Sequence, residues 1–295
     1  MPLTPTTCIP LSADYAQGLL PLRHKAAHKG TFGSLAVIGG SEGMLGALML
    51  ASRSALLSGT GRVYALSLAS QPPAVDANTP EVMYRDLEWL HGEHNPATAY
   101  VIGPGLGQSA LALDCLSFCL QQSLPVLLDA DALNLIAIHA DLLARLQQRS
   151  AATVITPHPV EAQRLLNQSL EYIKMHRAAC ARLLAQRLNA VCVLKGAGSL
   201  VAPAPADIDD RCFINTSGNN GLATAGTGDV LSGLIGSLLA QGMPAVNAAK
   251  LGVYVHGAAA DALLAGGVGP IGLTASEVSL AARLTLNQLY LAQHG

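Results

Sequence analysis

Short, almost wholly apolar segments alternate with longer helical segments along most of this chain. The apolar segments begin near residues 34, 63, 99, 125, 152 and 190, and the first of them is followed by a helical stretch at 43–59. Strands without polar residues at alternate positions are typical of a sheet that is buried on both faces. The alternation therefore predicts an α/β fold with a doubly wound, mostly parallel sheet flanked by helices, followed by a mainly helical C-terminal third.

Composition excludes several classes of protein. Apolar residues make up 51% of the 295 residues, which is ample for a large core, and the net charge of −2 gives no footprint for nucleic acid or a membrane surface. No apolar run is long enough to span a bilayer, and the first residues do not resemble a signal peptide. The six cysteines contain no CxxC pair, so we interpret them as reduced core residues of a cytoplasmic protein.

Polar and glycine-rich loops follow the predicted strands in succession. They contain the sequences GGSEG, GPGLGQ, DAD, TPHPVE, KGAGS and GTGD. Ligands of doubly wound folds bind beyond the carboxyl ends of the strands, where such loops meet. Neither common nucleotide motif is present: GSEGMLGA lacks the lysine of a P-loop, and Gln108 stands where GPGLGQ would need a third glycine for a Rossmann fingerprint.

The segment NTSGNNGLATAGTGDVLSGLIGSLLAQG, residues 215–242, carries one aspartate among many glycines. A helix beginning near Asp229 would offer unpaired N–H groups, so Gly226, Thr227 and Gly228 form a candidate anion hole for a phosphoryl group. Asp229 is then a candidate general base for a hydroxyl that attacks this group. The alternative is that Asp229 only caps the helix. We also expect a single buried stripe on this helix, made of Val230, Leu231, Leu234, Ile235, Leu238 and Leu239.

The same segment resembles the signature of the ribokinase-like superfamily, and the chain as a whole resembles its ADP/ATP-dependent NAD(P)H-hydrate dehydratase family. The blocks HKGTFGSLAVIGG, VIGPGLGQ, LDADALN, ITPHPVEAQRLL and VLKGAGSLV occur in the order typical of that family. We therefore expect one ribokinase-like domain at 26–295 after an N-terminal extension at 1–25. That extension has no room for the epimerase domain of the bifunctional relatives, so we expect a separate epimerase and a stand-alone dehydratase.

The resemblance implies a function and a set of site residues. Family members dehydrate NADHX and NADPHX, the hydrated forms of NADH and NADPH, and bacterial members are similar in converting ADP to AMP and phosphate with Mg²⁺. The positions that match the hydrate site are Ala47, Gly107, His158 and Asp229. The positions that match the nucleotide site are Lys195, Gly196, Ala197, Gly198, Ser199 and Gly228. A homo-oligomer, with a tetramer as the family arrangement, is a further expectation.

Simpler interpretations of these residues stay open. KGAGS is also typical of a tight hairpin turn, His158 of a structural histidine fixed between two prolines, and Glu161 of a favourable charge in the first turn of a helix. Asp129 and Asp131 are candidates for holding Mg²⁺ through water, with Asn134 beside them. Two other functions share the motif: a kinase for a small alcohol such as a thiazole or pyrimidine precursor, and a non-catalytic adenine-nucleotide sensor.

Overall fold

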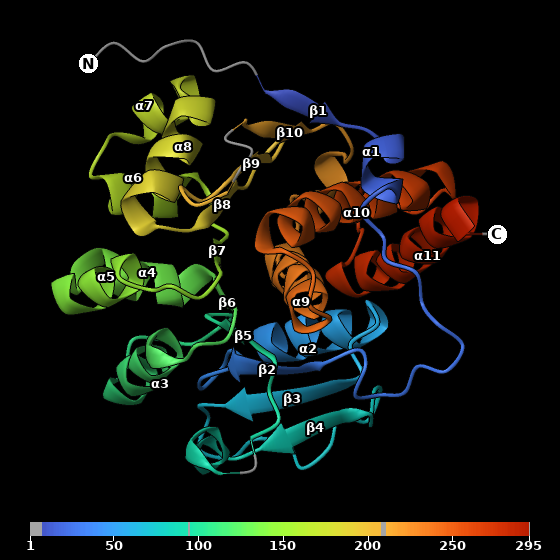
Figure 1. Ribbon diagram of the computed structural model, residues 1–295. Coiled ribbons are helices and arrows are strands. Elements are labelled where there is room, and N and C mark those ends of the chain that lie inside the picture. Colours follow the sequence, from blue (N-terminus) through green and yellow to red (C-terminus); the bar gives the residue numbers. More distant parts are fainter. Residues whose placement is uncertain (1–7, 94, 208–210, 295) are drawn as a thin grey trace.

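The computed structural model describes residues 8–93, 95–207 and 211–294. These residues form one ten-stranded sheet with the order β1-β10-β9-β8-β7-β6-β5-β2-β3-β4 (Figure 1). Neighbouring strands are parallel except in the β8–β9 and β9–β10 pairs, which are antiparallel. The strands are β1 (Ile9–Leu11), β2 (Ser34–Gly39), β3 (Arg62–Ser67), β4 (Val82–Arg85), β5 (Ala99–Ile102), β6 (Val126–Leu128), β7 (Thr153–Ile155), β8 (Val191–Leu194), β9 (Leu200–Ala202) and β10 (Phe213–Asn215).

Helices cover both faces of this sheet, and each face has its own hydrophobic core. One face is covered by α1 (Ala13–Gln17), α2 (Leu45–Leu57), α9 (Thr227–Ala240), α10 (Ala245–Ala265) and α11 (Ala275–His294). The other is covered by α3 (Ala110–Gln121), α4 (Ala130–Ile138), α5 (Ala140–Gln147), α6 (Pro159–Leu166), α7 (Leu170–Met175) and α8 (Arg177–Leu188). Two short 3-10 helices are η1 (Leu87–His91) and η2 (Asn220–Leu222). The predicted doubly wound, mostly parallel α/β fold is confirmed.

Helix α9 buries the apolar stripe expected from its sequence and, in addition, the small residues between the members of that stripe. It packs against α2, α10 and the sheet (Figure 1), and every residue from Val230 to Ala240 is buried. Small residues allow α9 to lie very close to its neighbours. A Cβ atom on Gly233, for example, would lie 2.0 Å from the carbonyl oxygen of Ala51 in α2. The predicted stripe is therefore confirmed as buried, but it is only part of the buried surface, because a helix enclosed on all sides is apolar or small all round.

The N-terminal residues that we separated from the domain contribute to its sheet. Strand β1 pairs in parallel with β10, and Ser12 caps α1 by accepting from the N–H of Tyr15. Lys250 of α10 is buried; its Nζ donates to the hydroxyl of Tyr15 and lies 3.6 Å from the ring centroid of Phe213. Residues 1–7 lie outside the described part of the chain, and the boundary at residue 25 stays a prediction.

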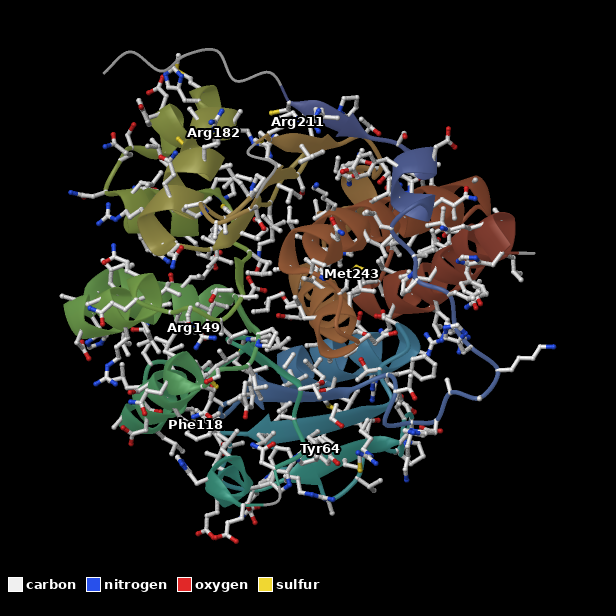
Figure 2. The ribbon with its side chains drawn as sticks, in the orientation of Figure 1. Tyr64, Phe118, Arg149, Arg182, Arg211 and Met243 are labelled. Atoms are coloured by element: carbon white, nitrogen blue, oxygen red, sulfur yellow. The ribbon has the colours of Figure 1, made fainter. Side chains whose placement is uncertain are left out.

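Buried polar groups and cysteines complete the second core. Arg149, labelled in Figure 2, donates to the carbonyl oxygens of Cys119, Leu120 and Gln122, and so satisfies the C-terminal end of α3. Cys119 is one of five cysteines that are buried, and none of the six forms a disulfide. This agrees with the prediction of reduced core cysteines.

Candidate active site

A cavity of about 590 Å³ lies where the 195–199 loop meets the start of α9. All five residues of KGAGS line it, as do Thr227 and Gly228 of the predicted anion hole. Further lining comes from the loop at 215–223 and from α10. The structure thus brings the predicted nucleotide residues together around one cavity, beyond the carboxyl end of β8.

Asp229 lies in the first turn of α9 but does not cap it. The N-cap is Gly226, whose φ of +87° belongs to the left-handed region that favours glycine, and it makes no side-chain capping bond. A Cβ atom on Gly226 would also lie 2.5 Å from Cδ1 of Leu50. The capping interpretation of Asp229 is therefore wrong, and within the described residues no hydrogen bond engages its carboxylate.

Lys195, which is partly buried, forms an ion pair with the buried Asp129 beside the cavity. Nζ of Lys195 lies 2.6 Å from Oδ1 of Asp129, and the hydroxyl of Ser232 donates to Oδ2 over 2.6 Å. Burial would lower the pKa of Lys195, but the charges of Asp129, Glu161 and Asp229 outweigh it and raise that pKa. The ammonium also lies 3.5 Å from where a Cβ atom on Gly228 would be, so it stands at the helix N-terminus as a permanent positive charge.

Asp229 is electrostatically suited to accept a proton. Burial raises its pKa to about 7, and the neighbouring carboxylate of Asp129 adds to this effect, while Lys195 opposes it and Asp131 raises it further. A carboxylate with a pKa near the working pH combines ionisation with strong proton affinity, which is the requirement for a general base.

The predicted hydrate residues lie outside this cavity, since Ala47, Gly107 and His158 do not line it. Ala47 is close to the loop after β5, because a Cβ atom placed on Gly105 of that loop would lie 3.2 Å from the Cβ atom of Ala47. The N–H of Gly107 donates to Oδ2 of Asp131 over 2.9 Å, and Asp131 in turn acts on the pKa of Asp229. The loop after β5 is thus connected to the catalytic candidate through Asp131.

His158 begins helix α6 as its N-cap and forms a capping box with Glu161. Its Nδ1 accepts from the N–H groups of Val160 and Glu161, its own N–H donates to Glu161 Oε2 over 2.7 Å, and Nε2 lies 3.2 Å from Oε1. Burial and the charge of Lys195 lower the pKa of His158, and burial raises that of Glu161 to about 7. Both ring nitrogens of His158 thus have partners in the first turn of α6: Nδ1 accepts from the backbone, and Nε2 faces the carboxylate of Glu161.

Three residues near the cavity had no motif to identify them. Arg177 at the start of α8 donates to the carbonyl oxygens of Leu194, Ala197 and Gly198, and so holds the KGAGS loop. Ser232 fixes Asp129, and His256 contacts the first residue of α9. Arg177 and His256 are distant in sequence from the residues they support, so only the folded chain reveals them; Ser232 lies one helical turn after Asp229.

Comparison with known proteins identifies the family. A model described as NAD(P)H-hydrate dehydratase matches residues 35–279, most of the chain. This chain belongs to the NAD(P)H-hydrate dehydratase family. It is 42% identical, over 90% of its length and 89% of the relative, to the ADP-dependent (S)-NAD(P)H-hydrate dehydratase of Neisseria meningitidis serogroup B.

Other members of the dehydratase family extend the comparison. The chain is 41% identical to the bifunctional NAD(P)H-hydrate repair enzyme of Escherichia coli over 86% of this chain but 48% of that protein, so it spans about half of this bifunctional relative. The ADP/ATP-dependent NAD(P)H-hydrate dehydratase of Bacillus subtilis, co-crystallised with ATP and Mg²⁺, superposes with a TM-score of 0.81 at 28% identity, covering 96% and 99% of the two chains. A ribokinase-like superfamily protein from Enterococcus faecalis gives 0.80 at 26% identity, covering 98% and 99%. The predicted ribokinase-like fold is confirmed.

The acidic side chains near the cavity do not form a closed metal cage within the described part of the chain. Among the described residues, no group of three or more His, Cys, Asp or Glu side chains is placed to hold a metal ion. Both carboxylate oxygens of Asp129 already accept hydrogen bonds, which favours a positioning role for it over metal binding. Asp131 accepts from the N–H of Gly107 with one oxygen, and its other oxygen has a long, weak contact of 3.5 Å with Nδ2 of Asn134. A phosphate-bound Mg²⁺ usually has one or two protein carboxylates near it, and Asp131 is suited to be one of them.

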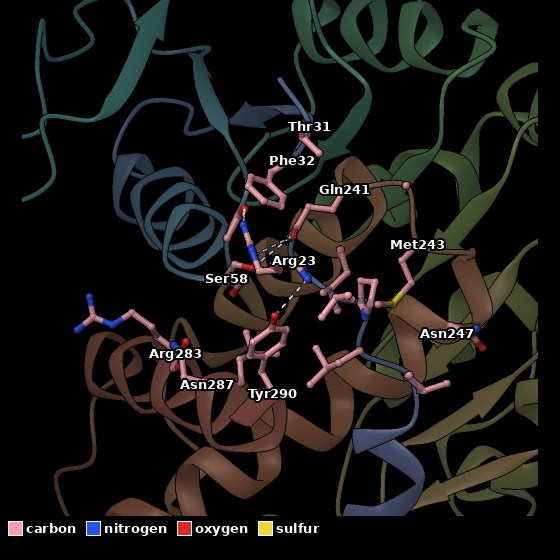
Figure 3. Close-up of a pocket in the computed structure, with 18 of the residues that line it drawn as sticks. Arg23, Thr31, Phe32, Ser58, Gln241, Met243, Asn247, Arg283, Asn287 and Tyr290 are labelled. Carbon is pink, nitrogen blue, oxygen red and sulfur yellow. Dashed lines mark hydrogen bonds between the residues drawn. The ribbon is translucent and has the colours of Figure 1, made fainter. Parts of the chain in front are cut away.

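A second cavity, of about 580 Å³, lies between the N-terminal segment and α11 (Figure 3). Arg23 lies 3.6 Å from the ring centroid of Phe32 and donates to the carbonyl oxygen of Gly59, while the hydroxyl of Tyr290 accepts from its N–H. None of the predicted site residues lines this cavity. Within the described residues, no helix is both long enough and apolar enough to cross a membrane.

Proposed function

We propose that this protein catalyses the ADP-dependent dehydration of (6S)-NADHX and (6S)-NADPHX to NADH and NADPH, with AMP and phosphate as the other products. The observation that carries the proposal is the position of Asp229, an unpaired carboxylate with a raised pKa next to the Lys195 ammonium and the glycine-rich start of α9. The named substrates and the preference for ADP follow the Neisseria relative.

The cavity is proposed to bind the nucleotide, with its phosphates toward the start of α9. The N–H groups of the first turn, together with Lys195, would meet the phosphoryl oxygens. Ala47, Gly107 and His158 are proposed to contact the hydrate on the other side of Asp229, where the partly exposed ring of His158 would meet it. Asp229 therefore stands between the two substrates.

The proposed chemistry replaces a poor leaving group, hydroxide, with a good one, phosphate. Asp229 takes the proton of the ring hydroxyl, and the hydroxyl oxygen attacks the terminal phosphoryl group, whose bond to the nucleotide breaks and leaves AMP. The carbon–oxygen bond of the phosphorylated ring next breaks with its electron pair staying on phosphate, and the lone pair of the ring nitrogen forms a double bond to that carbon. Loss of a proton from the adjacent ring carbon restores the dihydronicotinamide.

Mg²⁺ is proposed as the metal, as in the crystals of the Bacillus relative, and would neutralise charge on the phosphates when bound. Asp131 is the residue proposed to meet it, through water. A metal is expected from the charges of this chain as well, because Asp129, Asp131 and Asp229 lie near the phosphate position with a single lysine. Without a further cation, an anionic nucleotide would be repelled there.

The proposal is tested by mixing the protein with hydrated NADH and recording the near-ultraviolet absorbance of NADH with ADP, with ATP and without nucleotide. Recovery of NADH should require a nucleotide, with AMP and inorganic phosphate formed in equal amounts. A kinase would instead retain a phosphorylated product, and a nucleotide sensor would bind ADP without turnover; either result would replace the proposed activity.

Assembly, location and partners are further parts of the proposal. We expect a cytoplasmic homo-oligomer, a tetramer in the family arrangement, that works with a separate NAD(P)H-hydrate epimerase. Sedimentation equilibrium would test the tetramer, and a protein that stays monomeric at micromolar concentration would contradict it.

A further inference from the structure

One ring nitrogen in the cavity wall is not used by the protein itself. His256 of α10 is 9% exposed and lines the cavity. Its Nε2 lies 2.9 Å from the carbonyl oxygen of Thr227, the first residue of α9. A carbonyl oxygen only accepts, so Nε2 carries the hydrogen. Burial lowers the pKa of His256 to about 4, so the ring is neutral and Nδ1 keeps its lone pair.

Nδ1 has no partner among the described residues, yet it is not sealed in the core. The buried side-chain polar atoms without a partner in that part of the chain are Ser52 Oγ and Tyr84 OH, and Nδ1 is not one of them. It is therefore accessible, and the cavity that His256 lines is the space through which a buried residue can be reached.

The other buried or half-buried polar side chains of this wall are already engaged within the protein. The amide of Asn215 donates to the carbonyl oxygens of Ser217 and Val253, and its oxygen accepts from Ser217. The oxygen of Asn219 accepts from Gly221, and the hydroxyl of Thr227 donates to the carbonyl of Leu222. Nδ1 of His256 is thus a preorganised acceptor, open to the cavity, that can accept from a donor on a ligand.

We propose that Nδ1 of His256 accepts a hydrogen bond from the nucleoside part of the bound nucleotide, either a ribose hydroxyl or the exocyclic amino group of the base. The inference rests on the proposed nucleotide site. His256 contacts the residue at the start of the helix that faces the phosphates, and the ribose is the part of a nucleotide next to its phosphates. His256 would then select nucleotides that carry the matching donor.

The test measures dissociation constants by calorimetry for ADP, 2′-deoxy-ADP, 3′-deoxy-ADP and N6,N6-dimethyl-ADP, with the natural protein and with His256→Phe. Removing the donor that meets Nδ1 should weaken binding to the natural protein by roughly three- to tenfold, the size of one neutral hydrogen bond, and should not weaken binding to the variant further. The analogue that shows this coupling identifies the source. Coupling with none of the three would overturn the proposal.

A second measurement does not depend on the stability of the variant. The natural protein is labelled with ¹⁵N-histidine, and His256 is recognised as a ring that stays neutral when the pH is lowered. ADP should shift the Nδ1 resonance of this ring. The ADP analogue that lacks the donor identified by calorimetry should not shift it. If ADP binds and this resonance does not move, the inference alone fails. If ADP does not bind at all, the proposed function fails together with it.

Discussion

Nζ of Lys195 lies 2.6 Å from Oδ1 of Asp129, and this pair joins the nucleotide-binding candidate loop to the end of strand β6. Replacing Lys195 by Ala should weaken ADP binding by roughly tenfold or more, because a charge-assisted contact to phosphate contributes about 1.5–3 kcal/mol. Binding of the hydrate should change less. Calorimetry with each ligand measures the difference, and equal losses for both ligands would contradict it.

The same substitution should also destabilise the fold, and a double variant separates the two effects. Asp129 is 1% exposed, and removing the partner of a buried charge typically costs about 3–5 kcal/mol. In Lys195→Ala combined with Asp129→Asn, the buried charge that had been paired with Lys195 Nζ is also removed, so much of the free energy of unfolding should recover while nucleotide affinity stays low. Recovery of affinity along with stability would assign Lys195 a structural role.

Asp229→Asn should leave the fold intact and lower turnover by about 10²–10⁴-fold, the usual contribution of a general base. Asp229 makes no capping bond, so neither Asn nor Ala should lose helix-cap stability. Nucleotide affinity should hold or rise because a negative charge beside the phosphates is removed. Melting temperature, affinity and turnover are measured on both variants, and near-normal turnover of the Asn variant would end the general-base assignment.

The activity should depend on pH through the carboxyl of Asp229, whose pKa is about 7. A general base acts when it is ionised, so kcat/KM should be highest above that pH and fall about tenfold per pH unit below it. The residual activity of Asp229→Asn should lack this acidic limb. A profile of the natural enzyme that is flat down to about pH 5 would show that a different group takes the proton.

Gly233→Ala should destabilise the protein strongly, because the new Cβ would lie 2.0 Å from the carbonyl oxygen of Ala51 and force α9 away from α2. Overpacking of this kind costs about 1–3 kcal/mol or more. The matched control is Gly46→Ala in α2, because a Cβ atom there would meet nothing within 4 Å. This substitution should stabilise the protein by about 0.5–1 kcal/mol. Chemical denaturation measures both, and equal effects would contradict the packing argument.

The strands that are buried on both faces could be predicted from the sequence, because short continuous apolar runs bounded by glycine-rich or polar loops are typical of such strands. Three strands at or near the sheet edges were not predicted, because none of them is a continuous apolar run: β1 contains Pro10, β4 ends in Arg85 and β10 ends in Asn215. KGAGS was also typical of a tight hairpin turn, and the structure shows that it connects the antiparallel strands β8 and β9.

The parts of the site that could be predicted are glycine-rich loops that carry a charged residue and follow a strand. Contacts between side chains from segments distant in sequence could not be predicted. GTGD located Asp229 correctly at the start of a helix, although Gly226 is the cap. Asp129 was a candidate for holding Mg²⁺ through water because DAD follows a strand; in the structure its carboxylate accepts from Lys195 and Ser232, which are distant in sequence. Such pairings depend on sheet order, which no local pattern specifies.

The enclosure of α9 also determines how the molecule can move. Local opening is least frequent where backbone and side chains are most deeply buried, and α9 is covered along its whole length after the first turn. Its amide hydrogens should therefore be among the last to exchange with solvent, while the exposed residues Gly196 and Ala197 exchange early. On this basis we expect the loops to move as ligands enter and leave, while the carboxylate of Asp229, the proposed base, stays attached to a deeply buried helix.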